Sequence, residues 1–294
     1  MHVFQSDSRQ RGRHDQTGLS GGSRAENLGR RDPRNVQNAE LDRNEVATGT
    51  RCARLPALQQ SSVLRFTRGG LAPLGKRMAI LKFDKEITAL LVIDPYNDFI
   101  SEGGKIWDRI KKVAEANHCV PHMLEVLNAA RKAGLRVFYA LDRRYRSGDY
   151  ETWKYIAPIQ KAAWSHKSFE HGTWGGEIRH EFEPRPGDIV AQEHWCSSGF
   201  ANTDLDLLLK KHGIHKLIVI GLIAHTCVEA TVRFAVELGY EVTMVKDATT
   251  DYSDEHMHAA LDVNLPNYAN AIVTTKEFVD SLSSLKPSGT SAQS

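Results

Sequence analysis

Short apolar runs alternate with amphipathic stretches along the chain from Met78 onward. The first run, Ile87–Ile93 (ITALLVI), is continuous and lies between charged residues and an Asp-Pro pair, which is typical of a strand buried on both faces. Similar runs predict five more strands, at Leu135–Leu141, Asp188–Ala191, Lys216–Gly221, Glu241–Val245 and Ala269–Thr274.

Apolar residues at helical spacing fill the gaps between most of these strands. They predict helices over Val120–Ala133, Thr203–His212, Cys227–Leu238 and Ser253–Asn264, followed by a short C-terminal helix. Ser253 is a candidate N-cap. Because strands and helices alternate, the crossovers should be right-handed and the sheet parallel. We therefore predict an α/β fold: a three-layer αβα sandwich with a six-stranded parallel sheet, over residues 78–285.

One connection is much longer than the others. The stretch Arg143–Gly187 contains Trp153, Trp164 and Trp174 and shows no long apolar run. Connections of this length usually carry function or cover a pocket. We expect an irregular, partly helical cover over the edge of the sheet.

The two ends of the chain differ from this domain. Residues 1–77 carry 13 Arg and one Lys against seven acidic residues, a net charge of +7, and have few apolar residues. We expect a disordered, Arg-rich extension without a catalytic role, and a disordered Ser-rich tail over 286–294. The stretch 51–77 lacks acidic residues, as in a mitochondrial presequence, although it begins 50 residues into the chain. Alternatively, Met78 is the effective start.

Composition limits the function classes. The 294 residues have a net charge of +2, four cysteines without paired metal-ligand spacing, and no apolar run of about 18 residues. These features argue against a membrane span, a disulfide scaffold and a nucleic-acid partner. We expect a reducing compartment, the cytoplasm, with mitochondria as the alternative.

Chemically versatile side chains follow three of the predicted strands. Asp94 ends the first strand, Glu193 and His194 follow the third, and Cys227 follows the fourth. Because ligands of parallel sheets bind beyond the carboxyl ends of the strands, these residues should share one rim. At a helix start, the thiol of Cys227 should have a lowered pKa and act as a nucleophile. A small buried cysteine is the alternative.

Asp94 ends an apolar strand, where a carboxylate is costly to bury unless it is paired or used. It could take the thiol proton and return it to a leaving nitrogen, or it could simply form an Asp-Pro turn. Asp98, four residues later, is expected to hold the loop.

Four blocks of sequence resemble the isochorismatase-like cysteine hydrolases. They are Asp94–Phe99 (DPYNDF), Ser198–Leu205 (SGFANTDL), Gly221–Thr231 (GLIAHTCVEAT) and Lys246–Ala248 (KDA). The resemblance covers roughly Ile87 to Thr275 and implies a Rossmann-like sheet and an Asp-Lys-Cys triad, in which Asp94 and Cys227 supply two members. It also implies a cis peptide between Leu222 and Ile223, with the N–H groups of Ile223 and Cys227 as the oxyanion hole.

The chain departs from this family at the third catalytic position. The register of the second block puts Glu193 where the family has Lys, and a negative charge there would raise the pKa of the cysteine. Glu193 could be protonated or salt-bridged, His194 could take over as the cation, or catalysis could be lost.

Two further departures concern the pocket. Tyr96 replaces the Gln of the opening motif, and Asp142-Arg143-Arg144 lacks the Asp-x-His metal motif of the nicotinamidases in this family. We therefore expect no metal and no cofactor. His166 and His171, in the cover, are expected to be surface residues.

The combined prediction is a cysteine hydrolase that cleaves a small amide or related acyl substrate through a thioester. Asp94, Glu193 and Cys227 are the catalytic candidates, and the pocket candidates are Phe99, Trp174, His194, Trp195 and His225. A non-catalytic relative that binds a small ligand and an isochorismate-type vinyl ether hydrolase are the alternatives. The expected partner is a small-molecule substrate, and the resemblance implies a homo-oligomer.

Overall fold

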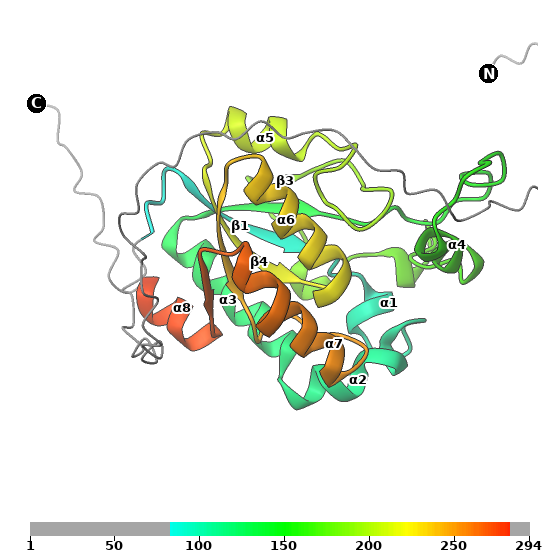
Figure 1. The fold of residues 1–294 in the computed structure, drawn as a ribbon, viewed down its shortest axis with the longest axis horizontal. Coiled ribbons are helices and arrows are strands. Elements are labelled where there is room, and N and C mark those ends of the chain that lie inside the picture. The colour runs from blue at the N-terminus through cyan, green and yellow to red at the C-terminus, as the bar shows by residue number, and fades with distance from the viewer. Residues whose placement is uncertain (1–82, 283–294) are drawn as a thin grey trace, which may run out of the picture. The chain divides into compact units, whose positions relative to one another are not determined.

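The computed structural model describes residues 83–282 (Figure 1). The predicted extension over 1–77 and the predicted tail over 286–294 both lie outside these residues. Among the described residues, no helix has the length and the apolar run that crossing a bilayer requires.

Six parallel strands form the sheet, which confirms the predicted α/β fold. They are β1 (Thr88–Ile93), β2 (Arg136–Ala140), β3 (Ile189–Val190), β4 (Lys216–Gly221), β5 (Glu241–Val245) and β6 (Ala271–Val273), in the spatial order β3-β2-β1-β4-β5-β6. The chain starts at the centre, moves outward to β3, and then returns to the other side of β1. The ends of β1 and β4 therefore flank the point where the strand order reverses, which is where ligands bind in such sheets.

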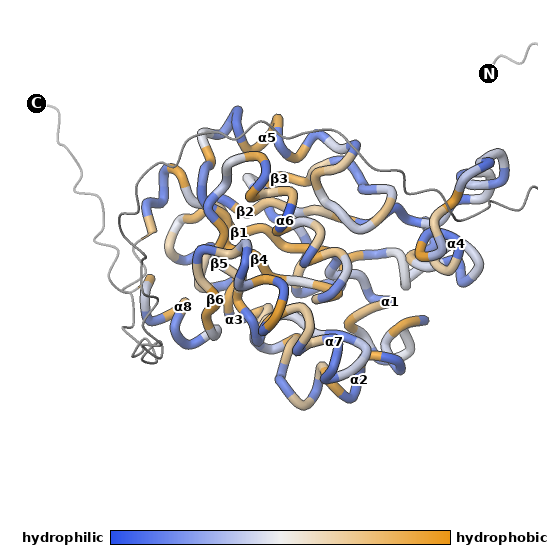
Figure 2. The backbone as a smooth tube through the Cα atoms, viewed as in Figure 1, coloured by the Kyte–Doolittle hydropathy of each residue, from blue (hydrophilic) through white to orange (hydrophobic). Residues whose placement is uncertain are grey.

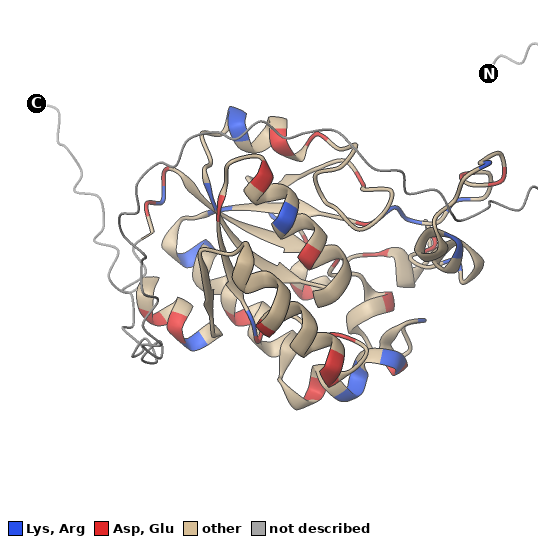
Figure 3. Ribbon diagram, in the orientation of Figure 1, with Lys and Arg blue, Asp and Glu red and all other residues tan. Residues whose placement is uncertain are grey.

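Each face of the sheet is covered by helices. On one face α2 (Trp107–Ala116), α3 (Cys119–Ala133) and α8 (Thr275–Leu282) share a buried core with Leu90 and Val92 of β1. On the other, α5 (Leu205–Lys211) and α6 (Glu229–Glu237) pack with Ala89, Leu91 and Ile93. β1 is buried along its whole length because its successive side chains enter both cores. Figure 2 shows the strands as largely hydrophobic, and Figure 3 shows charged residues mainly on the helices and loops.

The cover over 143–187 is partly helical, as predicted. It contains α4 (Pro158–Ser165) and two 3₁₀ turns, at Trp174–Gly176 and His180–Phe182. Figure 1 shows α4 on a part of the cover that projects from the body of the domain. None of the residues of α4 is buried.

Several predicted elements need correction. The helix predicted over Cys227–Leu238 begins earlier, as a π-helical segment over Ala224–Val228, and continues as α6. The helix predicted over Ser253–Asn264 has the expected Ser253 cap, but it divides into α7 (Asp254–His258) and a π-helical segment over Ala259–Asn264, followed by a 3₁₀ turn over Leu265–Asn267. The sequence analysis missed α2 and the short α1 (Asn97–Ile100), which connect β1 to α3.

Candidate active site

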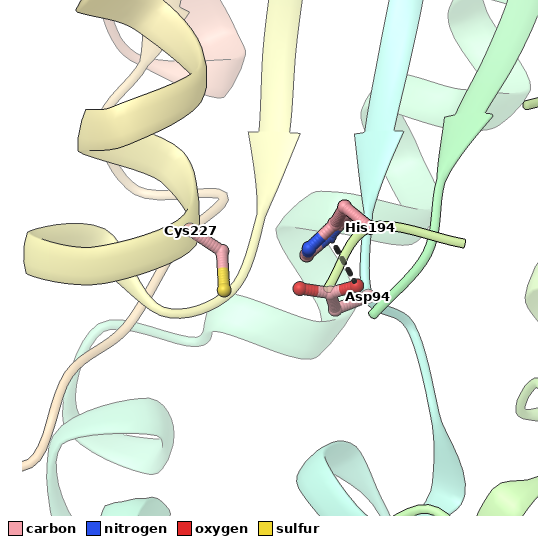
Figure 4. A group of neighbouring side chains, drawn as sticks. All are labelled: Asp94, His194 and Cys227. Atoms are coloured by element: carbon pink, nitrogen blue, oxygen red, sulfur yellow. Dashed lines mark ion pairs between the residues drawn. The ribbon is translucent and has the colours of Figure 1, made fainter. Parts of the chain in front are cut away.

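Three side chains from distant parts of the sequence meet at the carboxyl ends of the strands. Asp94 follows β1, His194 follows β3, and Cys227 lies in the π-helical segment after β4 (Figure 4). One carboxylate oxygen, one ring nitrogen and the sulfur all lie within 4.8 Å of one another, and all three residues are buried. The predicted proximity of Asp94 and Cys227 is therefore present.

Close packing of β1 against β4 allows Asp94 and Cys227 to approach each other. Gly221, the last residue of β4, has a φ of +124°, and a Cβ atom there would clash with the backbone of Ile93. Glycine alone tolerates both conditions without strain. The next peptide bond, Leu222–Ile223, is cis, as the family resemblance implied.

The two oxygens of Asp94 have different surroundings. Oδ1 accepts a hydrogen bond from the N–H of Asp142 at 2.5 Å and lies 3.3 Å from Nε2 of His194. Oδ2 is buried and has no hydrogen-bond partner among the described residues. Figure 4 shows this second oxygen directed toward the sulfur of Cys227. A buried carboxylate oxygen without a donor is well placed to accept the thiol proton.

His194 has an acceptor at each ring nitrogen. Nδ1 lies 2.5 Å from the carbonyl oxygen of Cys196, and Nε2 faces Asp94. Both nitrogens donate only when the ring is an imidazolium. Burial lowers the pKa of His194, but the charges of Asp94 and Asp142 outweigh it and raise the pKa to about 9. The two carboxylates therefore favour the protonated form of the ring.

The thiol of Cys227 is neutral in the resting protein. Burial raises its pKa well above the ordinary value, and the negative charges of Asp94 and Asp142 raise it further. The expectation that a helix start lowers this pKa was wrong. Desolvation and two carboxylates exceed the effect of the helix terminus, and Cys227 stands one turn inside the helical segment.

Glu193 lies outside this group of three. Its carboxylate receives Arg144 Nε at 2.5 Å and Arg143 Nη1 at 3.3 Å, so it is salt-bridged, one of the states that the sequence left open. An isolated parallel bridge pairs Asp142 with His194 beyond the end of β3. Because neighbouring residues of an extended segment point to opposite sides, His194 faces Asp94 and Glu193 does not.

The remaining pocket candidates are more dispersed. Phe99 is buried against Phe169, with ring centroids 4.7 Å apart, and Trp174 is 54% exposed. Trp195 packs against Trp153 and, with Cys196 and Ser198, lines a cavity of about 340 Å³. His225 binds the buried carboxylate of Asp251 through Nδ1 at 2.7 Å. Among residues 83–282, none of these four side chains forms a hydrogen bond or an ion pair with Cys227.

In the part of the chain that the structure describes, two groups contain the donor types that metals use: the group of three described above, and His225, Asp251 and His256. In the first, Nε2 of His194 lies 3.3 Å from Oδ1 of Asp94. In the second, the Asp251 carboxylate already accepts the N–H groups of His225 and Tyr252 and the Nδ1 hydrogen of His225.

Comparison with known proteins identifies the family. The model of the isochorismatase domain matches residues 88–277. The chain belongs to the isochorismatase family. This matched region contains all three residues of the candidate site and lies inside the predicted domain.

Relatives of this isochorismatase-family chain include amidohydrolases. It is 31% identical to the ureidoacrylate amidohydrolase RutB of Caulobacter segnis over 228 residues, 74% of this chain and 95% of that protein. It is 29% identical to RutB of Rhizobium rhizogenes over 210 residues, 68% and 85% of the two chains. The structure of a cysteine hydrolase from Pseudomonas syringae pv. phaseolicola matches with a TM-score of 0.59 at 22% identity, covering 69% and 96%, which supports the fold.

Proposed function

We propose that this hydrolase cleaves the C–N bond of a small amide through a thioester on Cys227. The observation that carries the proposal is the meeting of Asp94, His194 and Cys227 at the ends of β1, β3 and β4. It supplies a nucleophile, a proton acceptor and a cation in one buried place.

The first half of the reaction forms the thioester. Oδ2 of Asp94 takes the proton from Sγ of Cys227 as the sulfur attacks the carbonyl carbon of the substrate. The N–H groups of Ile223 and Cys227 hold the resulting oxyanion. Asp94 then gives the proton to the nitrogen, the C–N bond breaks, and the amine leaves.

The second half of the reaction hydrolyses the thioester and regenerates the free enzyme. Asp94 takes a proton from water as the oxygen of that water attacks the thioester carbonyl. The C–S bond breaks, the acid leaves, and the sulfur recovers a proton from Asp94. The positive charge of His194 compensates for the negative charge that moves between Asp94 and Cys227, which is the role the family resemblance gives to Lys.

The substrate class is proposed from the relatives. The two RutB proteins are named for ureidoacrylate, so a small ureido compound is the first candidate substrate. Glu193 does not favour the non-catalytic alternative, because Arg143 and Arg144 neutralise its charge. A nucleophilic cysteine beside a proton acceptor favours acyl transfer over cleavage of a vinyl ether. We retain the homo-oligomer as a proposal.

Mass spectrometry of the acid-quenched protein tests this function. Incubation with ureidoacrylate or a simple ureido amide should add the acyl mass to the peptide that contains Cys227. The Cys227→Ala variant should carry no such adduct, and Cys119, which is fully buried, serves as an internal control. Turnover of the amide by Cys227→Ala, or turnover by the wild type with no trapped thioester, would contradict the mechanism.

A further inference from the structure

A second carboxylate stands beside His194. Asp142 follows β2 and pairs with His194 through the parallel bridge. Its Oδ1 lies 3.9 Å from Nδ1 of His194, whereas Asp94 Oδ1 lies 3.3 Å from Nε2. The imidazole ring therefore lies between two carboxylates that approach it from opposite edges.

The backbone and side chain of Asp142 are fixed by several contacts. Its N–H donates to Asp94 Oδ1 at 2.5 Å, and its carbonyl oxygen accepts the hydroxyl of Tyr96 at 2.9 Å. Its own Oδ1 accepts the N–H of Arg143 at 2.7 Å. The backbone N–H of Asp142 is thus hydrogen-bonded to Asp94, and its carboxylate forms an ion pair with His194.

The nearby guanidinium groups do not neutralise Asp142. Arg143 pairs with Asp149 and Glu193, and Arg144 pairs with Glu193. In the part of the chain that the structure describes, His194 is the only cationic side chain in an ion pair with Asp142. The negative charge of Asp142 therefore favours the imidazolium form of His194, and the positive charge of His194 favours the carboxylate form of Asp142.

We propose that Asp142 is a positioning residue that keeps His194 protonated, so that two carboxylates rather than one maintain the positive charge beside Cys227. The catalytic consequence rests on the proposed function. The charge relation between Asp142 and His194 exists in the resting protein and can be measured without turnover.

The groups facing His194 come from every neighbouring element. Asp94 follows β1, Asp142 follows β2, and the thiol of Cys227 approaches from the segment after β4. The carbonyl oxygen of Cys196 faces Nδ1, whereas the hydroxyl of Tyr96 donates to the carbonyl oxygen of Asp142 and Glu193 is paired with Arg143 and Arg144. Burial raises the pKa of Asp142 to about 7, with Asp94 acting in the same direction and His194 in the opposite one. Each of the two groups therefore favours the charged form of the other.

Two isosteric variants separate charge from shape. Asp142→Asn removes the charge and retains an oxygen that can accept the N–H of Arg143. Asp149→Asn is the matched control, because Asp149 binds Arg143 but has no contact with His194. Asp142→Glu restores the charge. The measurement is the titration midpoint of the His194 ring by NMR, in the full chain without substrate.

The expected midpoint is near pH 9 in the wild type. Asp142→Asn should lower it by about one to two pH units, as loss of an opposite charge at this distance does. Asp149→Asn should leave it unchanged, and Asp142→Glu should recover most of the shift. An unchanged midpoint in Asp142→Asn, or an equal shift in Asp149→Asn, would overturn the proposal.

Activity provides a separate readout. If the thioester forms, the alkaline limb of the pH–kcat profile should move down with the NMR midpoint in Asp142→Asn. If no thioester forms in any variant but the NMR midpoint still falls, the proposed function fails while the relation between Asp142 and His194 stands.

Discussion

Asp94 influences Cys227 in two opposite ways. In the proposed mechanism it accepts the thiol proton and makes the sulfur reactive when substrate is bound, whereas its buried negative charge opposes the thiolate in the resting protein. The sulfur would therefore remain a thiol until Asp94 accepts its proton during attack on the substrate.

Asp94→Asn separates these two effects. We expect hydrolysis to fall by about 10²–10⁴-fold, because the general base is lost. Alkylation of Cys227 by iodoacetamide at pH 8 should become faster, because removing the negative charge lowers the pKa of the thiol. Peptide mapping distinguishes Cys227 from the exposed Cys196. Slower alkylation of Cys227 in this variant would contradict the electrostatic assignment.

His194 supplies a cation that titrates in an accessible range. The wild-type kcat should fall above about pH 9, where the imidazolium loses its proton. In His194→Lys the ordinary pKa of the side chain is about 10.4, so the alkaline limb should move to higher pH. His194→Gln has no charge and should lose about 10²-fold in kcat across the range. Equal alkaline limbs in the wild type and His194→Lys would exclude His194 as the titrating group.

The sequence predicted Asp94, Glu193 and Cys227 as the catalytic residues, with the neighbouring His194 as an alternative cation. Both neighbours follow a strand of only two residues, and such a strand carries no apolar periodicity that fixes which side chain faces inward. The parallel bridge between Asp142 and His194, which are distant in sequence, sets the register in which His194 faces Asp94. The raised pKa of Cys227 was also invisible, because it depends on burial and on two carboxylates from separate strands.

At the scale of elements, the cover is held to the domain by Asp98. The predicted role of this carboxylate in holding the loop is confirmed. One oxygen accepts the N–H of Lys105 at 3.0 Å, and the other accepts the N–H of Phe169, within the cover, at 2.8 Å. Gly175 packs so closely on the carboxylate that a Cβ atom there would clash.

Asp98→Ala should weaken the whole domain. The substitution leaves two backbone N–H groups without their acceptor in a buried place, so the free energy of unfolding should fall by about 2–4 kcal/mol. Asp98→Asn, which keeps one acceptor oxygen, should lose less. Urea denaturation measures both, with Asp108→Ala on the exposed side of α2 as the control. A loss no larger than that of the control would show that other contacts hold the cover.

Elements with long apolar runs were the ones predicted well. β4 and β5 have the predicted bounds, because each run is continuous and ends at a clear change in polarity. α2 was missed, although its buried residues Trp107, Ile110 and Val113 recur every three positions, a helical signal that could have been found. The π-helical start before α6, over Ala224–Val228, has no such signal.

On the scale of the whole molecule, strand order determines the site. Alternating strands and helices predicted a parallel sheet, but they did not fix the order β3-β2-β1-β4-β5-β6. This order brings β1 next to both β2 and β4, so Asp94 can reach Asp142 on one side and Cys227 on the other. A buried imidazolium and two carboxylates at the carboxyl ends of the strands then link the stability of the protein to pH.

The free energy of unfolding should therefore decrease as the pH rises from about 6.5 to about 9. The folded pKa of His194 is about 9 and the ordinary value is 6.5, so the folded state holds a proton that the unfolded chain releases first. The stabilisation is fully present below pH 6.5 and is lost as pH rises through 9. A shift of this size corresponds to about 3 kcal/mol.

Urea denaturation of the wild type and of His194→Gln, at intervals from pH 6 to pH 10, measures this contribution. The wild type should lose stability relative to the variant across this range, because only the wild type has the linked proton. Asp142 acts in the same direction at lower pH, since its folded pKa of about 7 also exceeds its ordinary value of 3.8. A parallel dependence in both proteins would mean that His194 is neutral in the folded state, and the cation assigned to this site would then have to come from another residue.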